Sequence, residues 1–307
     1  MQVALAAPER HNPGRAPPRV DLVPKNASYA ATLPDSSTPS GMTRPPKLLV
    51  FDSGLGGLTV FAEIIKLRPG ADYVYCADDA GFPYGSWKEP DLVARVMSVM
   101  EGLIAEHAPD MVVIACNTAS TLVLPHLRDR WPQLPFVGTV PAIKPAAERS
   151  RTKLISVLGT PGTVARDYTQ NLIAQFAAHC RVTLVGSATL ARMAETRMHG
   201  GGVCDEDIAA EIAPCFVEED GRRTDAIVLA CTHYPLLVED FRRLAPWSAD
   251  WIDPAPAIAR RADQLLRERG FEETFTGTGQ ARAVFTSGAK PDAQLRATLA
   301  RFGLVAG

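Results

Sequence analysis

The amino-acid sequence predicts an α/β fold of two similar, pseudo-symmetric domains, each a mostly parallel sheet flanked by helices, with the functional site in the cleft between them. One observation behind this prediction is the alternation, from Lys47 onward, of short apolar runs with stretches of helical spacing. Another is a repeat, because residues 110–118 read DMVVIACNT and residues 225–233 read DAIVLACTH. In both, an Asp and a buried-strand run lead to a Cys followed by polar side chains, and 115 residues separate the paired positions.

Each strand expected in the first half is a short apolar run, and these runs lie at 48–51, 73–77, 111–115 and 136–138. Between them, apolar residues recur at helical spacing over 58–65 and 92–103, and a further helix is expected from 117 to about 130. Pro69 and Gly70 end the first of these helices, because proline cannot continue the hydrogen-bond pattern and glycine favours a helix end.

The same cycle restarts after residue 150. Strands are expected at 154–158, 182–185, 227–230 and 283–286, and helices at 164–179, 189–197, 206–219, 236–244, 257–269 and after the last strand. We place one domain at residues 45–140 plus 255–307 and the other at 141–254. Residues 1–44 carry seven prolines and no sustained apolar periodicity, so we expect a disordered N-terminal tail there.

The composition is that of an ordinary globular protein, with 46% hydrophobic and 21% charged residues in a chain of 307. A net charge of −2 argues against a nucleic-acid partner bound through phosphate neutralisation, and no apolar run is long enough to span a bilayer. The apolar stretch at 3–7 is too short for the core of a signal peptide, so a cytoplasmic location is expected. The six cysteines are scattered without a CxxC pair, which fits neither a disulfide framework nor a zinc site.

Polar residues follow several of the predicted strands at their carboxyl ends, where open α/β sheets bind ligands. Two related domains that face each other would bring these loops to one cleft. The residues at these strand ends are Asp52, Ser53, Asp78, Asp79, Cys116, Asn117, Thr118, Thr160, Cys231, Thr232 and His233.

Cys116 and Cys231 are the strongest candidates for chemistry. Each stands where a helix can begin, and a helix N-terminus lowers a thiol pKa from about 8.5 and so enriches the thiolate. Two matched cysteines suit a reaction in which a proton leaves one side of a carbon and returns on the other. The alternative role for any cysteine is that of a small buried hydrophobe, and we expect it for the other four.

A glycine-rich turn, VFDSGLGGL at 50–58, delivers Asp52 and Ser53 from a strand into the start of a helix. Glycines allow close approach of the backbone, and free N–H groups at a helix start favour anions. A dinucleotide fingerprint with Asp72 as its downstream acid is one alternative, but Thr59 stands where the third glycine is expected. An Asp at the mouth of the loop would also repel phosphate. A carboxylate-binding turn, with Asp52 handling or orienting a proton, fits better.

The remaining motifs keep two interpretations each. The turn DDAGFPYG at 78–85 is an ordinary Pro/Gly turn or, through its paired Asp residues, a metal site; the shortage of nearby histidines argues against a transition metal, and we expect none. Thr160 and Thr163 stand at a helix start and can bind a carboxylate, although Thr163 is equally suited to be a plain N-cap. His233 either supports the chemistry of Cys231 or is a buried structural histidine.

At these residues the chain closely resembles the glutamate racemase family, whose members need no cofactor. The matching motifs are FDSGLGG at 51–57, PYG at 83–85, ACNTA at 115–119, GTPGT at 159–163 and ACTHYP at 230–235, in the family order across about residues 47–305. The resemblance implies interconversion of L- and D-glutamate without a cofactor, supplying D-glutamate for peptidoglycan. The implied partner is this small molecule, with no nucleic acid and no membrane, and a homodimer is left open.

The resemblance also implies a role for each site residue. Cys116 and Cys231 exchange protons with opposite faces of the substrate α-carbon, Asp52 assists Cys116, and His233 assists Cys231. Counting along 187–195 assigns the glutamate that the family carries near this histidine to Glu195. The positions that match substrate contacts are Ser53, Tyr84, Gly85, Asn117, Thr118, Thr160, Thr163 and Thr232. The chain departs from many relatives in having Gly81 in place of an Arg, so loop rigidity or subunit contacts are expected to differ there.

Two other functions compete with this one. A racemase of the same superfamily that acts on aspartate or a hydantoin would share both cysteine motifs, and racemisation assays on a panel of substrates separate the two. A two-lobed binding protein with incidental cysteines would be indifferent to substitution of either cysteine by serine.

Overall fold

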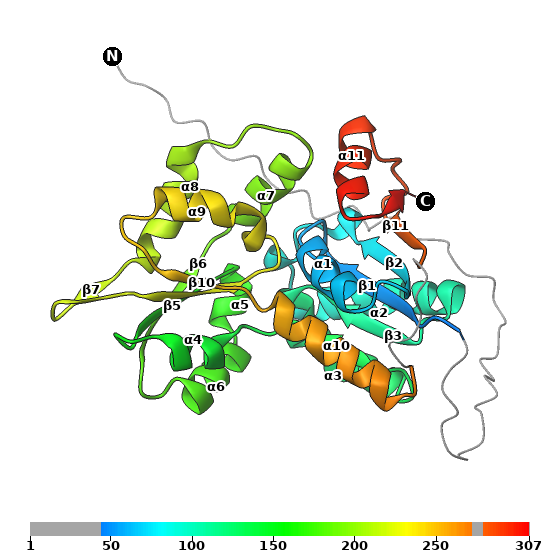
Figure 1. Cartoon of the computed structure of the whole chain (residues 1–307), viewed down its shortest axis with the longest axis horizontal. Coiled ribbons are helices and arrows are strands. Elements are labelled where there is room, and N and C mark those ends of the chain that lie inside the picture. Colours follow the sequence, from blue (N-terminus) through cyan, green and yellow to red (C-terminus); the bar gives the residue numbers. More distant parts are fainter. Residues whose placement is uncertain (1–43, 272–278, 307) are drawn as a thin grey trace. The chain divides into compact units, whose positions relative to one another are not determined.

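The computed structural model describes residues 44–271 and 279–306, which belong to one compact unit, Ser36–Gly307. The tail expected at residues 1–44 lies outside the described residues, apart from Arg44. Two parallel sheets form the framework of this unit, with helices on both faces of each (Figure 1), which confirms the predicted fold class. No helix among the described residues has both the length and the apolar character that crossing a membrane requires.

The first sheet has six strands in the order β12-β11-β2-β1-β3-β4, and every neighbouring pair is parallel. Its strands are β1 (Lys47–Asp52), β2 (Asp72–Ala77), β3 (Met111–Ile114), β4 (Phe136–Gly138), β11 (Ala281–Phe285) and β12 (Val305–Ala306). The interior strands β1 and β3 are buried almost throughout, as their continuous apolar runs predict.

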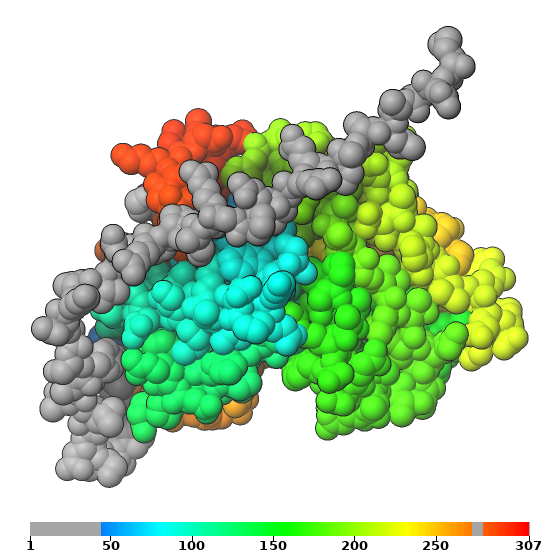
Figure 2. All heavy atoms as spheres, turned by 180° about the vertical axis from the view of Figure 1, so that it is seen from behind, coloured from blue at the N-terminus to red at the C-terminus, as the bar shows by residue number. Residues whose placement is uncertain are grey.

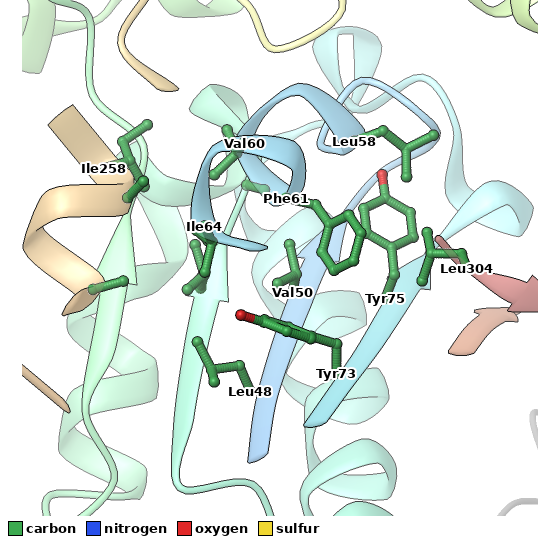
Figure 3. Packing of buried hydrophobic residues seen from close by; sticks show 14 of the residues in the cluster. Leu48, Val50, Leu58, Val60, Phe61, Ile64, Tyr73, Tyr75, Ile258 and Leu304 are labelled. Atoms are coloured by element: carbon green, nitrogen blue, oxygen red, sulfur yellow. The ribbon is translucent and has the colours of Figure 1, made fainter. Parts of the chain in front are cut away.

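Helices cover both faces of this sheet. One face carries α1 (Leu58–Leu67), α10 (Ala255–Glu268) and α11 (Ala293–Arg301), and the other carries α2 (Glu89–His107) and α3 (Asn117–Arg130). In the core of the first face, Val50 of β1 lies beside Tyr73 and Tyr75 of β2 and Phe61 of α1 (Figure 3). The Phe61 ring meets the two tyrosine rings edge-on, with centroids 5.2 and 6.1 Å away. This packing holds the start of α1, and therefore the glycine-rich turn before it, against the sheet.

The second sheet has the order β10-β9-β5-β6 and is also parallel throughout. Its strands are β5 (Leu154–Gly159), β6 (Arg181–Gly186), β9 (Ala226–Ala230) and β10 (Asp250–Ile252). The helices α4 (Ile143–Arg149) and α6 (Asp167–Phe176) cover one face, and α7 (Leu190–Met198), α8 (Asp205–Ile212) and α9 (Val238–Leu244) cover the other. The short elements are α5 (Pro161–Ala165), an antiparallel hairpin of β7 (Glu218–Glu219) and β8 (Arg222–Arg223), and the 3₁₀ turns η1 (Asp79–Gly81), η2 (Tyr84–Ser86), η3 (Ala213–Cys215) and η4 (Tyr234–Leu237).

The two sheets repeat one topology. The strands β2-β1-β3-β4 of the first correspond in order to β6-β5-β9-β10 of the second. The aspartates that precede β3 and β9 correspond as well: Asp110 accepts a hydrogen bond from the backbone N–H of Lys47 (2.8 Å), and Asp225 accepts from those of Arg151 (2.7 Å) and Thr152 (3.0 Å). Each aspartate therefore ties the beginnings of two central strands together, which gives a physical reason for the Asp in both repeats.

Several boundaries differ from the sequence prediction. The single helix expected at 164–179 is two helices, α5 and α6, because Arg166 between them has an extended backbone conformation. The helix expected at 206–219 ends at Ile212, since Pro214 cannot continue an α-helix. The strand expected at 283–286 is β11, which begins and ends slightly earlier. The sequence predicts neither β10 nor β12. β12 has only two residues, and β10 begins with the exposed Asp250, so it lacks the apolar start that marks the equally short β4.

The loops at the carboxyl ends of the two sheets meet. Helix α5, which follows strand β5 of the second sheet, contacts η2 and α3, which follow strands of the first sheet. Figure 2 shows the cyan and green segments of the chain side by side. Two contacts join the glycine-rich turn to the part of the chain that carries the second sheet: the Gly56 backbone nitrogen lies 3.2 Å from His233 Nε2, and the Leu55 N–H donates a hydrogen bond to Glu195 Oε1. The domain boundaries given above, at 140/141 and 254/255, stay a prediction.

Candidate functional site

Cys116 lies directly after β3 and is the N-cap residue of α3. Its side chain is buried, and its Sγ lies 3.9 Å from the Ser53 hydroxyl oxygen. Burial, followed by the negative charge of Asp52, raises the pKa of the Cys116 thiol well above its ordinary value, and the Ala119 N–H at the helix start offsets this only in part. The lowered pKa that its place at a helix N-terminus predicted is therefore wrong for Cys116, because desolvation outweighs the helix.

Cys231 occupies the corresponding position after β9 in the second sheet. Its buried Sγ lies 3.9 Å from Nδ1 of His233, and the other ring nitrogen of His233 lies 2.8 Å from Glu195 Oε1 on α7. Burial alone would lower the pKa of His233, but its hydrogen bonds with Cys231 and Glu195, together with the charges of Glu195 and Asp52, raise it well above its usual value. The imidazole is therefore held as an imidazolium between a sulfur and a carboxylate.

Glu195 completes this row of groups. Burial would raise the pKa of its carboxyl, but the hydrogen bond and charge of His233 and the Leu55 N–H lower it overall. The 2.8 Å contact between Glu195 and His233 requires one proton between the two atoms, and both shifts place that proton on the histidine. The prediction that assigned a glutamate partner of His233 to Glu195 therefore agrees with the geometry.

The glycine-rich turn brings the two layers into contact. A methyl group added at Gly56 would lie only 2.6 and 2.7 Å from ring carbons of His233, and one added at Gly54 would overlap the Glu195 carboxylate. Gly57 is closed in by Asp52, whose Oδ2 accepts the Gly57 N–H (2.7 Å). These glycines are required because another part of the chain packs onto their backbone, and the dinucleotide interpretation is not needed to explain them.

Asp52 is fully buried beneath this turn. Burial raises the pKa of its carboxyl, while the charge of His233 and the backbone N–H groups of Gly57 and Ser53 act in the opposite direction. The Ser53 hydroxyl lies 3.4 Å from Asp52 Oδ1 and therefore stands between that carboxyl and the Cys116 sulfur. Asp52, Ser53 and Cys116 form one connected group.

Three threonine hydroxyls converge where the two layers meet. Thr118 Oγ1 lies 3.4 Å from both Thr160 Oγ1 and Thr163 Oγ1, and the last two are 3.0 Å apart. Thr160, and not Thr163, is the N-cap residue of α5, because its hydroxyl accepts the Thr163 N–H (3.2 Å). Gly85 packs against Thr160, where an added methyl group would lie 3.2 Å from Thr160 Cβ. The structure thus brings these predicted substrate contacts from both layers together.

Asn117 adjoins Thr118 and is also buried. Among the described residues, neither its side-chain oxygen nor its side-chain nitrogen has a hydrogen-bond partner. Because buried polar groups are almost always paired, an amide of this kind is suited to a polar ligand.

Tyr84 and Thr232, which we expected to contact the substrate, make contacts within the protein. The Tyr84 hydroxyl donates a hydrogen bond to the buried carboxylate of Asp78. Asp78 also accepts hydrogen bonds from Nε and Nη2 of Arg95 (2.7 and 2.6 Å), so this acid anchors the loop. Thr232 is buried next to Cys231, and its backbone carbonyl accepts the Thr59 hydroxyl (3.2 Å).

The Asp78 anchor also explains Gly81. A methyl group at Gly81 would lie 2.8 Å from Asp78 Oδ2 and would overlap Arg95, so the guanidinium of Arg95 fills the space beside this glycine. Within residues 44–271 and 279–306, no group of three or more His, Cys, Asp or Glu side chains is arranged to hold a metal ion, and the aspartates at 78 and 79 are engaged in hydrogen bonds with protein groups.

Sequence reasoning missed two neighbours of the site. The ring of Phe82 packs on His233 with 5.4 Å between centroids, and His199 Nε2 lies 3.7 Å from Glu195 Oε2. The second could have been found, because His199 follows Glu195 by one helical turn. The first could not, since nothing in the sequence places the loop at 82 over a residue 151 positions later.

The two cysteines belong to one electrostatic environment. The charge of Cys231 is among those that raise the pKa of Cys116, although burial is the largest cause. The loops that carry them are linked through the glycine-rich turn, which binds Asp52 on one side and the His233–Glu195 pair on the other.

A family model and the sequences of known proteins match this chain, and the matches agree with one another. The family model described as Asp/Glu/Hydantoin racemase matches residues 59–262. The chain is 58% identical over 258 residues to the glutamate racemase of Sinorhizobium medicae, covering 84% of this chain and 94% of that protein. It is 53% identical over 273 residues to the glutamate racemase of Brucella abortus, covering 88% and 98%.

Solved structures agree with this result. The structure of Escherichia coli glutamate racemase in complex with L-glutamate and the activator UDP-MurNAc-Ala superimposes with a TM-score of 0.76 at 38% identity, covering 85% of this chain and 97% of that one. Glutamate racemase isoform RacE1 of Bacillus anthracis shares the fold, with a TM-score of 0.71 at 24% identity over 85% of this chain and 96% of that one.

Proposed function

Because this chain belongs to the Asp/Glu/Hydantoin racemase family and, within it, to the glutamate racemases, we propose that it interconverts L- and D-glutamate by two-base proton transfer between Cys116 and Cys231. The observation that carries this proposal is the matched placement of the two sulfurs. Each follows a corresponding central strand, and both adjoin the same glycine-rich turn through Ser53 and His233.

We assign the roles of acid and base to the two sulfurs. Burial raises the pKa of Cys116 and favours its thiol form, and His233 Nδ1, 3.9 Å from the Cys231 sulfur, is placed to exchange a proton with that sulfur. In one direction the Cys231 thiolate removes the α-proton, forming an S–H bond and leaving the electron pair on the α-carbon. The S–H bond of Cys116 then breaks, and its proton forms a new C–H bond on the opposite face. The reverse reaction exchanges the two roles.

The neighbouring acids support each sulfur. Glu195 orients His233 through one ring nitrogen, so that the other nitrogen faces Cys231. Burial raises the pKa of Asp52, and its carboxyl is connected to the Cys116 sulfur through the Ser53 hydroxyl. Asp52 is therefore placed to assist proton transfer at Cys116. We assign catalytic roles to these five groups: Cys116, Cys231, Asp52, His233 and Glu195.

Uncharged donors are available for the substrate's polar groups. The Asn117 amide and the hydroxyls of Thr118, Thr160 and Thr163 are buried together, and the backbone of Gly85 lies against them. Fixed donors in a site that excludes water stabilise a developing negative charge on a carboxylate more than the same groups in water, and positioning the thiolate against the α-carbon lowers the barrier further. We also propose Ser53, Tyr84 and Thr232 as parts of the substrate-binding wall.

Glutamate is the favoured substrate because the chain is 53–58% identical to glutamate racemases over 84–88% of its length. We infer that the product D-glutamate is used in peptidoglycan synthesis. Racemisation of aspartate or a hydantoin is the second candidate, since the matching family model includes such enzymes. A panel of L-glutamate, L-aspartate and a substituted hydantoin separates these substrates by rate.

The mechanism is tested by incubating L-glutamate with enzyme in D₂O, without added cofactor, while following optical rotation and α-deuterium. We expect both signals from the wild-type protein, and a loss of racemisation of at least about 100-fold in Cys116→Ser and in Cys231→Ser, since general acid–base groups contribute about 10²–10⁴-fold. The matched control is Cys180→Ser, which changes a half-buried thiol outside the site. Wild-type racemisation in either site variant, with unfolding midpoints unchanged, would refute the two-base assignment.

A further inference from the structure

We propose that Arg166 makes the site selective for amino acids with an acidic side chain, because its guanidinium supplies the positive charge for the substrate's side-chain carboxylate. This inference rests on the racemase function proposed above and adds a specificity-determining residue to it. Arg166 stands between α5 and α6, directly after the short helix that carries Thr163.

The Arg166 side chain reaches from the part of the chain that carries the second sheet to two helices that cover the first. Its Nη1 donates a hydrogen bond to the Thr121 hydroxyl on α3 (3.2 Å), and its Nε donates to Glu89 Oε1 at the start of α2 (3.4 Å). The Thr121 hydroxyl in turn donates to the backbone carbonyl of Thr118 (3.2 Å). The guanidinium therefore meets α3 about one helical turn beyond a member of the threonine cluster.

The same guanidinium borders helix α5 and the backbone of Gly85. A methyl group added at Gly162 would lie 3.5 Å from Arg166 Nη2 and 3.5 Å from the Gly85 carbonyl oxygen, so both groups face the space beside this glycine. Gly162 is between Thr160 and Thr163 in the chain, and the hydroxyl oxygens of these two threonines are 3.0 Å apart. The positive charge of Arg166 is thus placed next to the proposed substrate-binding wall.

The Arg166 guanidinium is shielded from solvent but only weakly paired. Its side chain is 12% exposed, whereas that of its acidic neighbour Glu89 is 62% exposed, so water weakens this ion pair. Arg166 Nη2 has no hydrogen-bond partner among the residues that the structure describes. Burial lowers the pKa of Arg166, and the charges of Glu89 and Cys116 act in the opposite direction, so the guanidinium lies within electrostatic reach of the reacting sulfur. Arginine stays a cation at neutral pH.

The charges of glutamate explain why the site needs a cation. At neutral pH the α-ammonium and the α-carboxylate carry opposite charges, so the side-chain carboxylate gives the molecule its net negative charge. The threonine hydroxyls and the Asn117 amide are uncharged, and burying a carboxylate among uncharged groups costs more free energy than burying it beside a cation. A neutral side chain gains nothing from Arg166. The residue therefore distinguishes acidic from neutral side chains.

The test varies the charge at position 166 in three steps: Arg166→Lys keeps it, Arg166→Gln removes it, and Arg166→Glu reverses it. We expect KM for L-glutamate to stay within about threefold of wild type in the first variant, to rise about tenfold in the second and about 100-fold in the third. Tenfold lies between the effect of an exposed ion pair, about fivefold at most, and that of a buried pair, above about 100-fold. We expect kcat to stay within about threefold throughout, because the side-chain carboxylate carries the same charge in the ground state and the transition state.

L-Glutamine separates recognition of charge from general damage to the site, since its side chain is neutral. In D₂O, kcat/KM for α-deuterium exchange should fall about tenfold for L-glutamate in Arg166→Gln and should stay within about twofold of wild type for L-glutamine. The control is Arg130→Gln, which removes the same charge from an exposed ion pair on α3 and should leave both values unchanged. Urea unfolding midpoints establish that each variant is folded under the assay conditions.

Three results would overturn the assignment of Arg166. They are a KM for L-glutamate in Arg166→Gln within about twofold of wild type, a fall in kcat without a rise in KM, and equal losses of kcat/KM for L-glutamate and L-glutamine. Each of these results leaves the racemase function standing as long as the wild-type protein racemises L-glutamate. Absence of racemisation by the wild-type protein would instead overturn the proposed function itself.

Discussion

The contact between the glycine-rich turn and His233 can be tested by adding one methyl group, in Gly56→Ala. The new Cβ would lie 2.6 and 2.7 Å from two carbons of the His233 ring, whereas ordinary contact begins at 3.4 Å. The ring would have to move by about 1 Å, and it has little freedom to do so because Glu195 binds one nitrogen and Phe82 packs on its face. Steric overpacking of this kind costs about 1–3 kcal/mol.

Activity should suffer more than stability in this variant. Displacement of a catalytic group by about 1 Å can cost about 100-fold in rate, so we expect kcat for L-glutamate to fall by about that factor. Urea unfolding should show a loss of about 1–3 kcal/mol. Gly102→Ala is the control, since nothing lies within 4 Å of a methyl group there and an alanine inside α2 should stabilise the helix by about 0.5–1 kcal/mol. A Gly56→Ala enzyme with wild-type kcat and stability would refute the close packing described here.

Two further predictions concern charge. Because the folded pKa of His233 is raised, its stabilising contribution is complete below the unfolded value of about 6.5 and is lost as the pH rises through the folded value. The pKa of Glu195 is lowered, so its stabilising contribution is present above about pH 4.5 and is lost as the pH falls through the folded value. At pH 5.5 both contributions are present, and we therefore expect the difference in unfolding free energy between wild type and His233→Gln, measured by urea unfolding, to be larger at pH 5.5 than at pH 9. A larger difference at pH 9 would contradict the assignment. Arg95→Ala leaves the fully buried Asp78 carboxylate without its cation and should lower the free energy of unfolding by about 3–5 kcal/mol. The control Arg130→Ala removes an exposed ion pair and should lower it by about 0–1 kcal/mol. Equal losses of unfolding free energy in the two variants would argue against the Asp78 anchor.

Much of the fold could be predicted because the central strands leave strong local signals. β1, β3, β5 and β9 are buried runs of continuous apolar residues, and the repeat around Asp110 and Asp225 marks corresponding strands. The edge strands β10 and β12 could not be predicted, because β12 has two residues and β10 opens with the exposed Asp250 in place of the apolar residue that begins β4. The break at Arg166 could not be predicted either, since it is a backbone conformation inside a sequence that suits a helix.

The candidate site also has features that the sequence could predict and features that it could not. Residues at the carboxyl ends of strands, such as Cys116, Thr160 and Cys231, could be placed together from topology alone. The pKa of Cys116 was predicted in the wrong direction, because the local argument from a helix N-terminus did not include burial. The engagement of the Tyr84 hydroxyl by Asp78 could not be predicted from sequence, since that bond depends on how the loop folds back on its own strand.

The glycines show most clearly what the sequence leaves out. Gly54 and Gly56 are a local motif with several interpretations, and the reason for them is the approach of Glu195 and His233 from the other layer. At Gly81, the space that a Cβ would need is filled by the guanidinium of Arg95, which reaches Asp78 there. In both cases a side chain distant in sequence occupies the place of the missing Cβ.

The most direct test of the two-base mechanism is a crystal structure of the enzyme with glutamate bound. We predict that the substrate α-carbon lies between the sulfurs of Cys116 and Cys231, on opposite faces and about 3–3.5 Å from each, as reacting atoms require. We also predict that its carboxylate contacts Asn117 and the threonine hydroxyls of residues 118, 160 and 163. A bound glutamate with both sulfurs on one face, or with either sulfur out of reach of the α-carbon, would contradict the mechanism.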